Sequence, residues 1–272
     1  MINKLAALMY GLASFATLAN AADLPRRDLA PAPALAPVFT WAGFYVGTQT
    51  AAINLDGNVR TNGNAANTIA EVATGQRPAS LSLTETNLAS GAQAGFNVQW
   101  GSVVLGVEGD LAFADVSPRA IFVGTLNDPS AFRQDLEWFG TARGRVGFAF
   151  DQALIYATGG LAFGDVTNSV ALLRNTEFAF QHVGRSSDWA VGYTVGAGVE
   201  FLLPAFLGNF SIVGRLLGAN SVTVKAEYLY FDLGDKNVLV NALPGFGINS
   251  FTSNFETKGH IGRLGFNYRF GT

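Results

Sequence analysis

The 272-residue sequence contains no cysteine, so it can form neither a disulfide framework nor a thiolate metal site. Charge is also scarce, because Asp, Glu, Lys and Arg make up 14% of the chain, against about 25% in ordinary soluble domains. The formal net charge of -3 argues against a basic nucleic-acid-binding surface. Beyond the first twenty residues, no apolar run approaches the ~18 residues that a membrane-spanning helix needs.

Glycine and aromatic residues are abundant instead. The chain has 32 Gly and 22 Phe, and its mean hydropathy is +0.25. Among membrane proteins, a chain without spanning helices can cross the bilayer only as a closed β-barrel, whose backbone groups are all paired. The composition therefore leaves the β-barrel as the membrane class to be tested.

The N-terminus has the features of an export signal, which we predict over residues 1–21. Lys4 supplies a positive charge, an apolar stretch follows, and Ala19-Asn20-Ala21 forms a small-x-small cleavage pattern. Cleavage is expected after Ala21, with Ala22 as the second choice, and a buried N-terminal helix is the alternative. The protein is therefore expected to leave the cytoplasm.

Residues 22–38 contain four of the nine prolines and are predicted to be an extended linker on the periplasmic side. A plain linker is favoured over a partner-binding role for Arg26 and Arg27. The remaining residues, 39–272, are predicted to form one outer-membrane β-barrel domain.

From Trp41 onward the dominant pattern has period two. In 88–100, for example, Phe96 and Trp100 share one face, and Gln93 shares the other with small residues. Each such segment has ten or more residues, which is the length of a tilted membrane-spanning strand. We therefore predict an all-β fold, an eight-stranded antiparallel transmembrane β-barrel. Its strands are expected in 41–54, 88–100, 103–115, 135–150, 154–165, 188–201, 221–234 and 258–270.

The connections alternate between short and long, as they do in a barrel with both termini in the periplasm. Short turns are expected at 101–102 and 151–153. The inner connection 202–220 is an exception, because it is long and apolar; it either extends the adjoining strands or forms an interfacial helix. A soluble β-sandwich would also alternate, but a face dominated by Gly and Ala better suits a crowded barrel interior. Long polar outer loops are expected at 55–87, 116–134, 166–187 and 235–257.

Charged residues on the small and polar face of these strands should point into the barrel. An eight-stranded barrel is only wide enough for side chains to fill, and unpaired buried charge is costly, so we expect these charges to pair and block the lumen. The alternative is a narrow, gated channel for water or small ions, whereas a general pore needs about 16 strands. This predicted lumen charge network comprises Glu108, Asp110, Glu137, Glu200 and Glu227 with Arg143, Arg145, Lys225, Arg263 and Arg269.

Aromatic residues near strand ends are typical of the girdles at the two membrane interfaces. The predicted girdle comprises Trp41, Trp100, Trp138, Phe150, Trp189, Tyr228 and Phe270.

A lipid-modifying enzyme is a more distant alternative, since it needs a nucleophile and a base within reach of each other. The chain offers only two histidines, His182 in an expected outer loop and His260 on the lipid side. No metal-ligand cluster or phosphate-binding loop appears in the sequence. We therefore predict no enzymatic activity, no cofactor and no metal.

Four segments carry a resemblance to a known family: ADLP at 22–25, FTWAGFYVG at 39–47, VGAGVE at 195–200 and VKAEYLYFDLG at 224–234. Together they resemble the alphaproteobacterial 25/31-kilodalton outer-membrane protein (RopB-like) family, porin-like barrels related in shape to OmpA and OmpX. The resemblance spans the mature chain. It implies an abundant barrel of the outer membrane with roles in envelope integrity and in contact with a host or the environment, and it brings no catalytic residues.

Two features depart from that family: 202–220 is long where a short turn is usual, and Gly271 and Thr272 follow the terminal aromatic residue. The last strand still alternates as the barrel-assembly machinery requires, so we expect insertion by that machinery. The other expected partners are outer-membrane lipid, lipopolysaccharide and surface ligands of the outer loops, with no role for nucleic acid.

Overall fold

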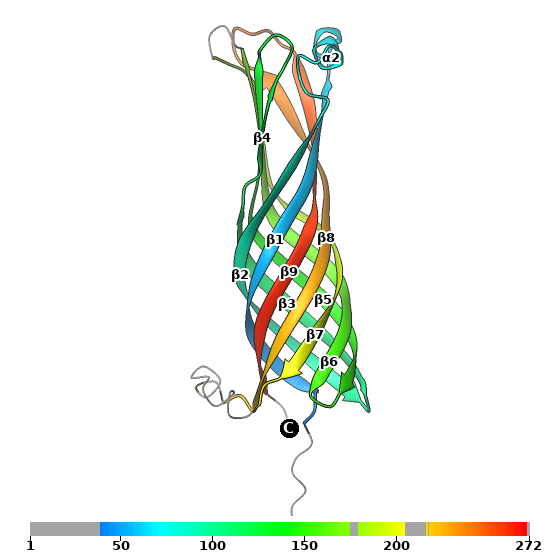
Figure 1. Ribbon diagram of the computed structural model, residues 1–272. Coiled ribbons are helices and arrows are strands. Elements are labelled where there is room, and N and C mark those ends of the chain that lie inside the picture. Colours follow the sequence, from blue (N-terminus) through cyan, green and yellow to red (C-terminus); the bar gives the residue numbers. More distant parts are fainter. Residues whose placement is uncertain (1–38, 175–178, 205–215, 217, 271–272) are drawn as a thin grey trace, which may run out of the picture. The chain divides into compact units, whose positions relative to one another are not determined.

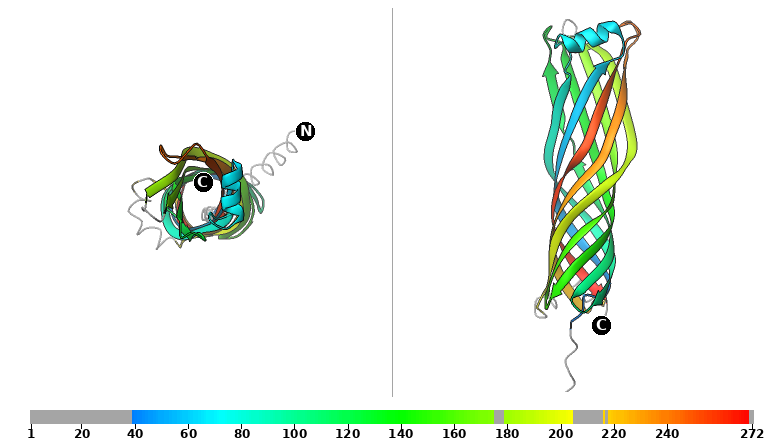
Figure 2. Two further views of the ribbon diagram at one scale, coloured as in Figure 1. Left: turned by 90° about the horizontal axis from the view of Figure 1, so that it is seen from above. Right: turned by 90° about the vertical axis from the view of Figure 1, so that its right-hand side faces the viewer.

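The computed structural model describes residues 39–174, 179–204, 216 and 218–270. They form a closed ring of eight antiparallel strands in the order β1, β2, β3, β5, β6, β7, β8 and β9, and β9 pairs with β1 to close the ring (Figures 1 and 2). The short β4 is an additional strand on β5. The predicted all-β, eight-stranded barrel is confirmed. The strands are β1 (Gly43–Gly63), β2 (Ser80–Trp100), β3 (Val103–Val116), β4 (Arg119–Val123), β5 (Pro129–Phe150), β6 (Ala153–Arg174), β7 (Ala179–Leu202), β8 (Ser221–Ala242) and β9 (Ser250–Phe270).

The two ends of the barrel differ. At the terminal end the first and last strands meet, with Phe44 opposite Phe270, and tight turns join β2 to β3 and β5 to β6. At the opposite end, called the α2 end below, the helix α2 (Ala66–Ala73) follows β1 and lies along one side of the barrel rim (Figure 2). Among the described residues, no helix has the length and apolar character needed to cross a membrane.

The outward-facing side chains are mostly apolar in the half of the barrel nearer the terminal end and mostly polar nearer α2, where Ile121, Val123 and Phe180 are exposed exceptions. In β1, Phe44 and Val46 point outward while Tyr45 points inward, as the sequence pattern predicts. Farther along the same strand Ile53 and Leu55 are buried inside. The geometric alternation continues, but the apolar residues change from the outer to the inner face.

This change corrects the prediction of four long polar loops. Strands continue through most of 55–87, 116–134, 166–187 and 235–257. The outer face of these extensions is mostly polar, so no continuous apolar band marks them as strands. A 21-residue strand such as β1 spans roughly 50 Å along a barrel axis at a rise of about 3.3 Å per residue and a tilt near 40°, about twice the ~25 Å apolar band of such barrels.

Backbone pairing is incomplete in the half nearer α2. Between β7 and β8 the paired residues jump from Val183–Asn241 to Tyr193–Asp232. On the other side, the pairing of β2 with β3 ends at Ala89–Ala114, and the described pairs include none between β2 and β4. Side chains must therefore help to hold this half of the barrel together.

The predicted signal at 1–21 and linker at 22–38 lie outside the described residues, as does most of the connection 202–220. Strand β7 ends at Leu202 and β8 begins at Ser221.

Candidate functional site

Nine charged side chains meet inside the barrel, in the half nearer the terminal end. Glu108 on β3 lies at the centre: its carboxylate accepts from Lys225 Nζ at 2.8 Å and from Arg143 Nη2. Arg145 and Arg263 approach the same carboxylate to 3.6 and 3.7 Å. Because these residues come from β3, β5, β8 and β9, the contacts join strands around the ring.

Two further carboxylates complete this part of the network. Asp110 lies 3.2 Å from both Arg143 Nη2 and Arg263 Nη1. Glu227 accepts from Arg143 Nη1 at 3.0 Å and is also ion-paired with Arg263. All of these side chains are buried. Each cation thus contacts at least one carboxylate, as a low-dielectric interior requires.

Nearer the terminal end, Glu200 on β7 is shared by two arginines. Its carboxylate accepts from Arg145 Nη1 at 3.2 Å and from Arg269 Nη1 at 3.3 Å. Thr223 and Asn267 donate to the same carboxylate. The Tyr45 ring lies beside both guanidinium groups, with centroid distances of 4.7 Å to Arg145 and 5.4 Å to Arg269.

Apolar layers lie on both sides of this network. Trp41, Val104 and Leu154 belong to a buried cluster at the terminal end. Toward α2, a second cluster that includes Phe139 and Phe231 fills the lumen. A polar layer follows, in which Gln134 bonds Asn168 and Thr257, and then a third apolar cluster. The charge network, the polar layer and the three apolar clusters therefore follow one another along the lumen.

Glu137 is the one predicted member of the network that does not belong to it. It is exposed on the outer surface, while Leu136 beside it is buried inside. The pairing of β5 skips Glu137, since Leu136 pairs with Val166 and Trp138 with Asp165. The extra residue of this β-bulge shifts the alternation of inward and outward side chains by one position. Strict alternation along β5 therefore wrongly predicted an inward position for Glu137.

Trp41 is the second correction. It was expected in the aromatic girdle, yet it is only 1% exposed and lies in the cluster at the terminal end. Its carbonyl oxygen accepts from Asn97 Nδ2 and from Arg269 Nη2. Trp41 precedes β1, so strand alternation does not apply to it, and the chain places it inside the barrel.

The other predicted girdle residues lie on the outer wall. Trp100, Phe150, Trp189 and Tyr228 are exposed, and Trp138 and Phe270 are partly exposed.

The two histidines lie in different surroundings. His260 is on the outer wall, where its Nδ1 is 2.7 Å from the Tyr228 hydroxyl. His182 is buried near the α2 end with its ring edge-on to Phe251, and burial together with the nearby Arg77 lowers the pKa of His182. No cluster of three potential metal ligands occurs within the described ranges.

A contact at the α2 end was missed by sequence reasoning. Arg77, which follows α2, is fully buried and donates to the Pro129 and Leu173 carbonyls and to the Ser130 and Gln181 side chains. These acceptors belong to β5, β6 and β7. We call this set of bonds the Arg77 clasp; it joins the connection after β1 to the opposite side of the barrel. Burial lowers the pKa of Arg77 and raises that of Glu71, whose carboxylate lies 3.7 Å from Arg77 Nε.

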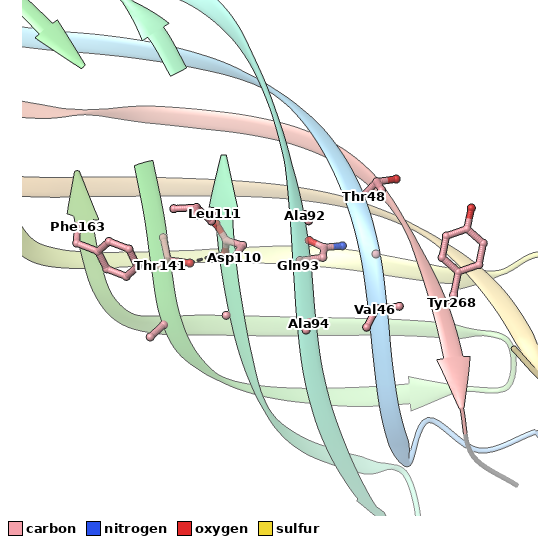
Figure 3. A pocket seen from close by; sticks show the side chains of 13 residues that line it. Val46, Thr48, Ala92, Gln93, Ala94, Asp110, Leu111, Thr141, Phe163 and Tyr268 are labelled. Atoms are coloured by element: carbon pink, nitrogen blue, oxygen red, sulfur yellow. Dashed lines mark hydrogen bonds between the residues drawn. The ribbon is translucent and has the colours of Figure 1, made fainter. Parts of the chain in front are cut away.

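A shallow groove of about 680 Å³ runs along the outer wall (Figure 3). Small outward side chains such as Thr48, Ala92 and Ala94 form its floor, and Phe163 and Tyr268 come from strands on either side of that floor. Its lining is almost entirely apolar. The groove lies on the outer side of the strands whose inner side carries the charge network, and Asp110 of that network is among its lining residues.

A closed antiparallel ring, an apolar outward band and an interior that holds a charge network between apolar layers together define an outer-membrane β-barrel. A family model described as "Outer membrane protein beta-barrel domain" matches residues 29–270, and the chain belongs to this family.

The chain is similar to two outer-membrane proteins of Brucella. It is 33% identical over 273 residues to the 31 kDa outer-membrane immunogenic protein of Brucella melitensis, covering 95% of this chain and 96% of the relative. It is 27% identical over 238 residues to the 25 kDa outer-membrane immunogenic protein of Brucella abortus, covering 87% of each. These relatives confirm the resemblance to the 25/31-kilodalton family and place the protein in the outer membrane.

The solved structure of the outer membrane protein OprG from Pseudomonas aeruginosa has the same fold. It superposes with a TM-score of 0.50 at 14% identity, covering 85% of this chain and 97% of OprG.

Proposed function

We propose that this protein is a structural component of the outer membrane whose α2 end faces outward and makes surface contacts. The observation that carries the proposal is the filled lumen. The ion pairs of Glu108, Glu200 and Glu227 and the apolar clusters on both sides of them occupy the interior. A filled interior favours a structural role over a passive channel for water or small ions.

Exposed apolar residues near the α2 end support the surface-contact role. Ile69 on α2, Leu126 before β5, Phe180 on β7 and Ile248 before β9 are more than half exposed. Exposed apolar residues gathered at one end are typical of protein or membrane contact sites. We infer that these four residues, called the apolar tips below, contact surface ligands.

We further propose lipopolysaccharide and outer-membrane lipid as lateral partners, since the strands extend well beyond the apolar band. The barrel-assembly machinery is proposed as the partner during insertion, because Leu264, Phe266, Tyr268 and Phe270 keep the alternation of the last strand.

A catalytic role is not proposed. His182 is packed edge-on against Phe251 near the α2 end, and His260 bonds Tyr228 on the outer wall. Neither arrangement pairs a nucleophile with a base.

A deletion strain complemented by two variants tests the proposal. Deletion is expected to increase sensitivity to detergent, and both the wild type and a tip variant (I69S, L126S, F180S and I248S together) should restore resistance. Only the wild type should restore attachment of cells to a surface. A deletion strain with normal detergent resistance but slowed uptake of small solutes would favour the channel instead.

A further inference from the structure

The lumen charge network carries more positive than negative charge. With Glu137 outside, four carboxylates face five cations among the described residues. The carboxylates are Glu108, Asp110, Glu200 and Glu227, and the cations are Arg143, Arg145, Lys225, Arg263 and Arg269. An uncompensated charge in a closed barrel interior is very costly, so the surplus needs a counter-charge.

The contacts locate this surplus at the terminal end. Glu108, Asp110 and Glu227 are matched by Arg143, Lys225 and Arg263, three against three. The remaining carboxylate, Glu200, is shared by Arg145 and Arg269. Arg145 also lies 3.6 Å from Glu108, but Arg143, Lys225 and Arg263 already share that carboxylate, so one arginine of this pair lacks a full negative partner.

Unpaired hydrogen-bond donors occur at the same place. Trp41 Nε1, Arg145 Nη2 and Arg269 Nε are buried and have no hydrogen-bond partner. Their side chains form one group, because the Arg269 guanidinium lies 5.1 Å from the Trp41 ring centroid and both arginines lie beside Tyr45. Glu200, the acceptor between them, already accepts from four donors, three of them on Oε1 and one on Oε2.

We propose that Trp41, Arg145 and Arg269 form a binding site for a small monovalent inorganic anion such as chloride. The anion supplies the missing negative charge and accepts from the unpaired N–H groups. A water molecule would satisfy the N–H groups but not the charge, and a neutral Lys225 would remove the charge but leave the donors unpaired. The two observations together favour an anion, and the site does not depend on the function proposed above.

The site predicts that chloride stabilises the folded barrel. In detergent micelles at constant ionic strength, the unfolding temperature should rise as sodium chloride replaces sodium gluconate, and the rise should saturate, because a ligand of the folded state alone stabilises it. Trp41→Phe keeps an aromatic side chain and all charges but deletes the Nε1–H donor, so it should raise the half-saturating chloride concentration several-fold. Trp100→Phe, on the exposed wall, is the matched control and should behave as wild type.

Identical unfolding temperatures in the two salts would overturn the proposal, as would an unchanged chloride response in Trp41→Phe. Crystals of the wild-type protein grown in bromide give an independent measurement that needs no variant. An anomalous bromide peak beside Arg145 and Arg269 is expected, and a water molecule or a protein group there without such a peak would contradict the site.

Discussion

At the scale of single residues, the lumen charges are stabilised by being shared. Glu108 contacts Arg143, Arg145, Lys225 and Arg263, so its removal leaves four desolvated cations with fewer partners. Breaking one partner of a buried ion pair typically costs about 3–5 kcal/mol. The network should therefore be far more sensitive to substitution than the charged residues on the outer wall.

We expect Glu108→Ala to lower the free energy of unfolding by about 3–5 kcal/mol. Glu137→Ala removes the same side chain from an exposed position and should change it by about 0.5 kcal/mol or less. The temperature at which the folded band is lost on unboiled gels measures both variants. Equal behaviour of the two variants would mean that the assignment of residues to the two faces is wrong.

The same two residues show how far the sequence determines the site. Alternation along regular strands predicts the inward direction of Glu108, Asp110, Arg143 and Arg145, and the structure places all four inside. Alternation fails at Glu137, because a single-residue β-bulge exchanges the inward and outward positions that follow it. No residue type in the sequence marks the position of this bulge. Alternation also fails for Trp41, since the position before the first strand is set by tertiary packing.

At the scale of elements, the sequence pattern did not reveal the strands in the half of the barrel nearer α2, because their outer face is mostly polar. Its strands expose polar side chains to water and bury Val59, Leu83, Phe132 and Phe251 inside, which reverses the pattern of the membrane band. Alternation with the reversed phase is the signal that could have revealed these strands. The Arg77 clasp had no such signal, because it joins residues up to about one hundred positions apart.

We expect Arg77→Ala to loosen the α2 end without unfolding the barrel. The substitution removes hydrogen bonds from Arg77 to β5, β6 and β7, at an end of the barrel where no pairing of β2 with β4 is described. The loss of several charged hydrogen bonds should lower the local stability by about 3 kcal/mol. Amide hydrogen exchange should accelerate in α2 and around Ser130 and remain slow near Glu108. Arg60→Ala, at an exposed position on β1, is the control; equal acceleration in this variant would contradict the role of Arg77.

Acidification should loosen the same end through His182. Burial and Arg77 lower the pKa of His182 below its usual value near 6.5, so the opened state binds a proton more readily than the closed state. The stability of the α2 end should be greatest above pH 6.5 and should fall as the pH drops below it. Hydrogen exchange at pH 7.5 and 5.5, corrected for intrinsic rates, measures this dependence. His182→Phe should reduce it, and an unchanged dependence would contradict the role of His182, since Glu71, whose pKa is raised in the closed state, acts in the opposite direction.

At the scale of the whole molecule, the eight-stranded ring with its termini at one end fixes which connections share a side. Asn67, Asn127 and Asn249 all lie at the α2 end, and Asp151 lies in the turn at the terminal end. With no native cysteine, single Cys variants give an unambiguous signal. An impermeant thiol reagent should label the first three positions on whole cells and leave Asp151→Cys unlabelled. Labelling of Asp151→Cys alone would reverse the proposed orientation.

The central claim of this account is that side chains close the lumen, and the conductance of the purified protein in a planar lipid bilayer tests it most directly. The charge network and the apolar clusters on both sides of it fill the interior along the described chain. The wild-type protein should therefore give no stable current step of porin size, whereas Glu108→Ala should give a small leak. A stable, porin-sized step from the wild-type protein would contradict the closed lumen.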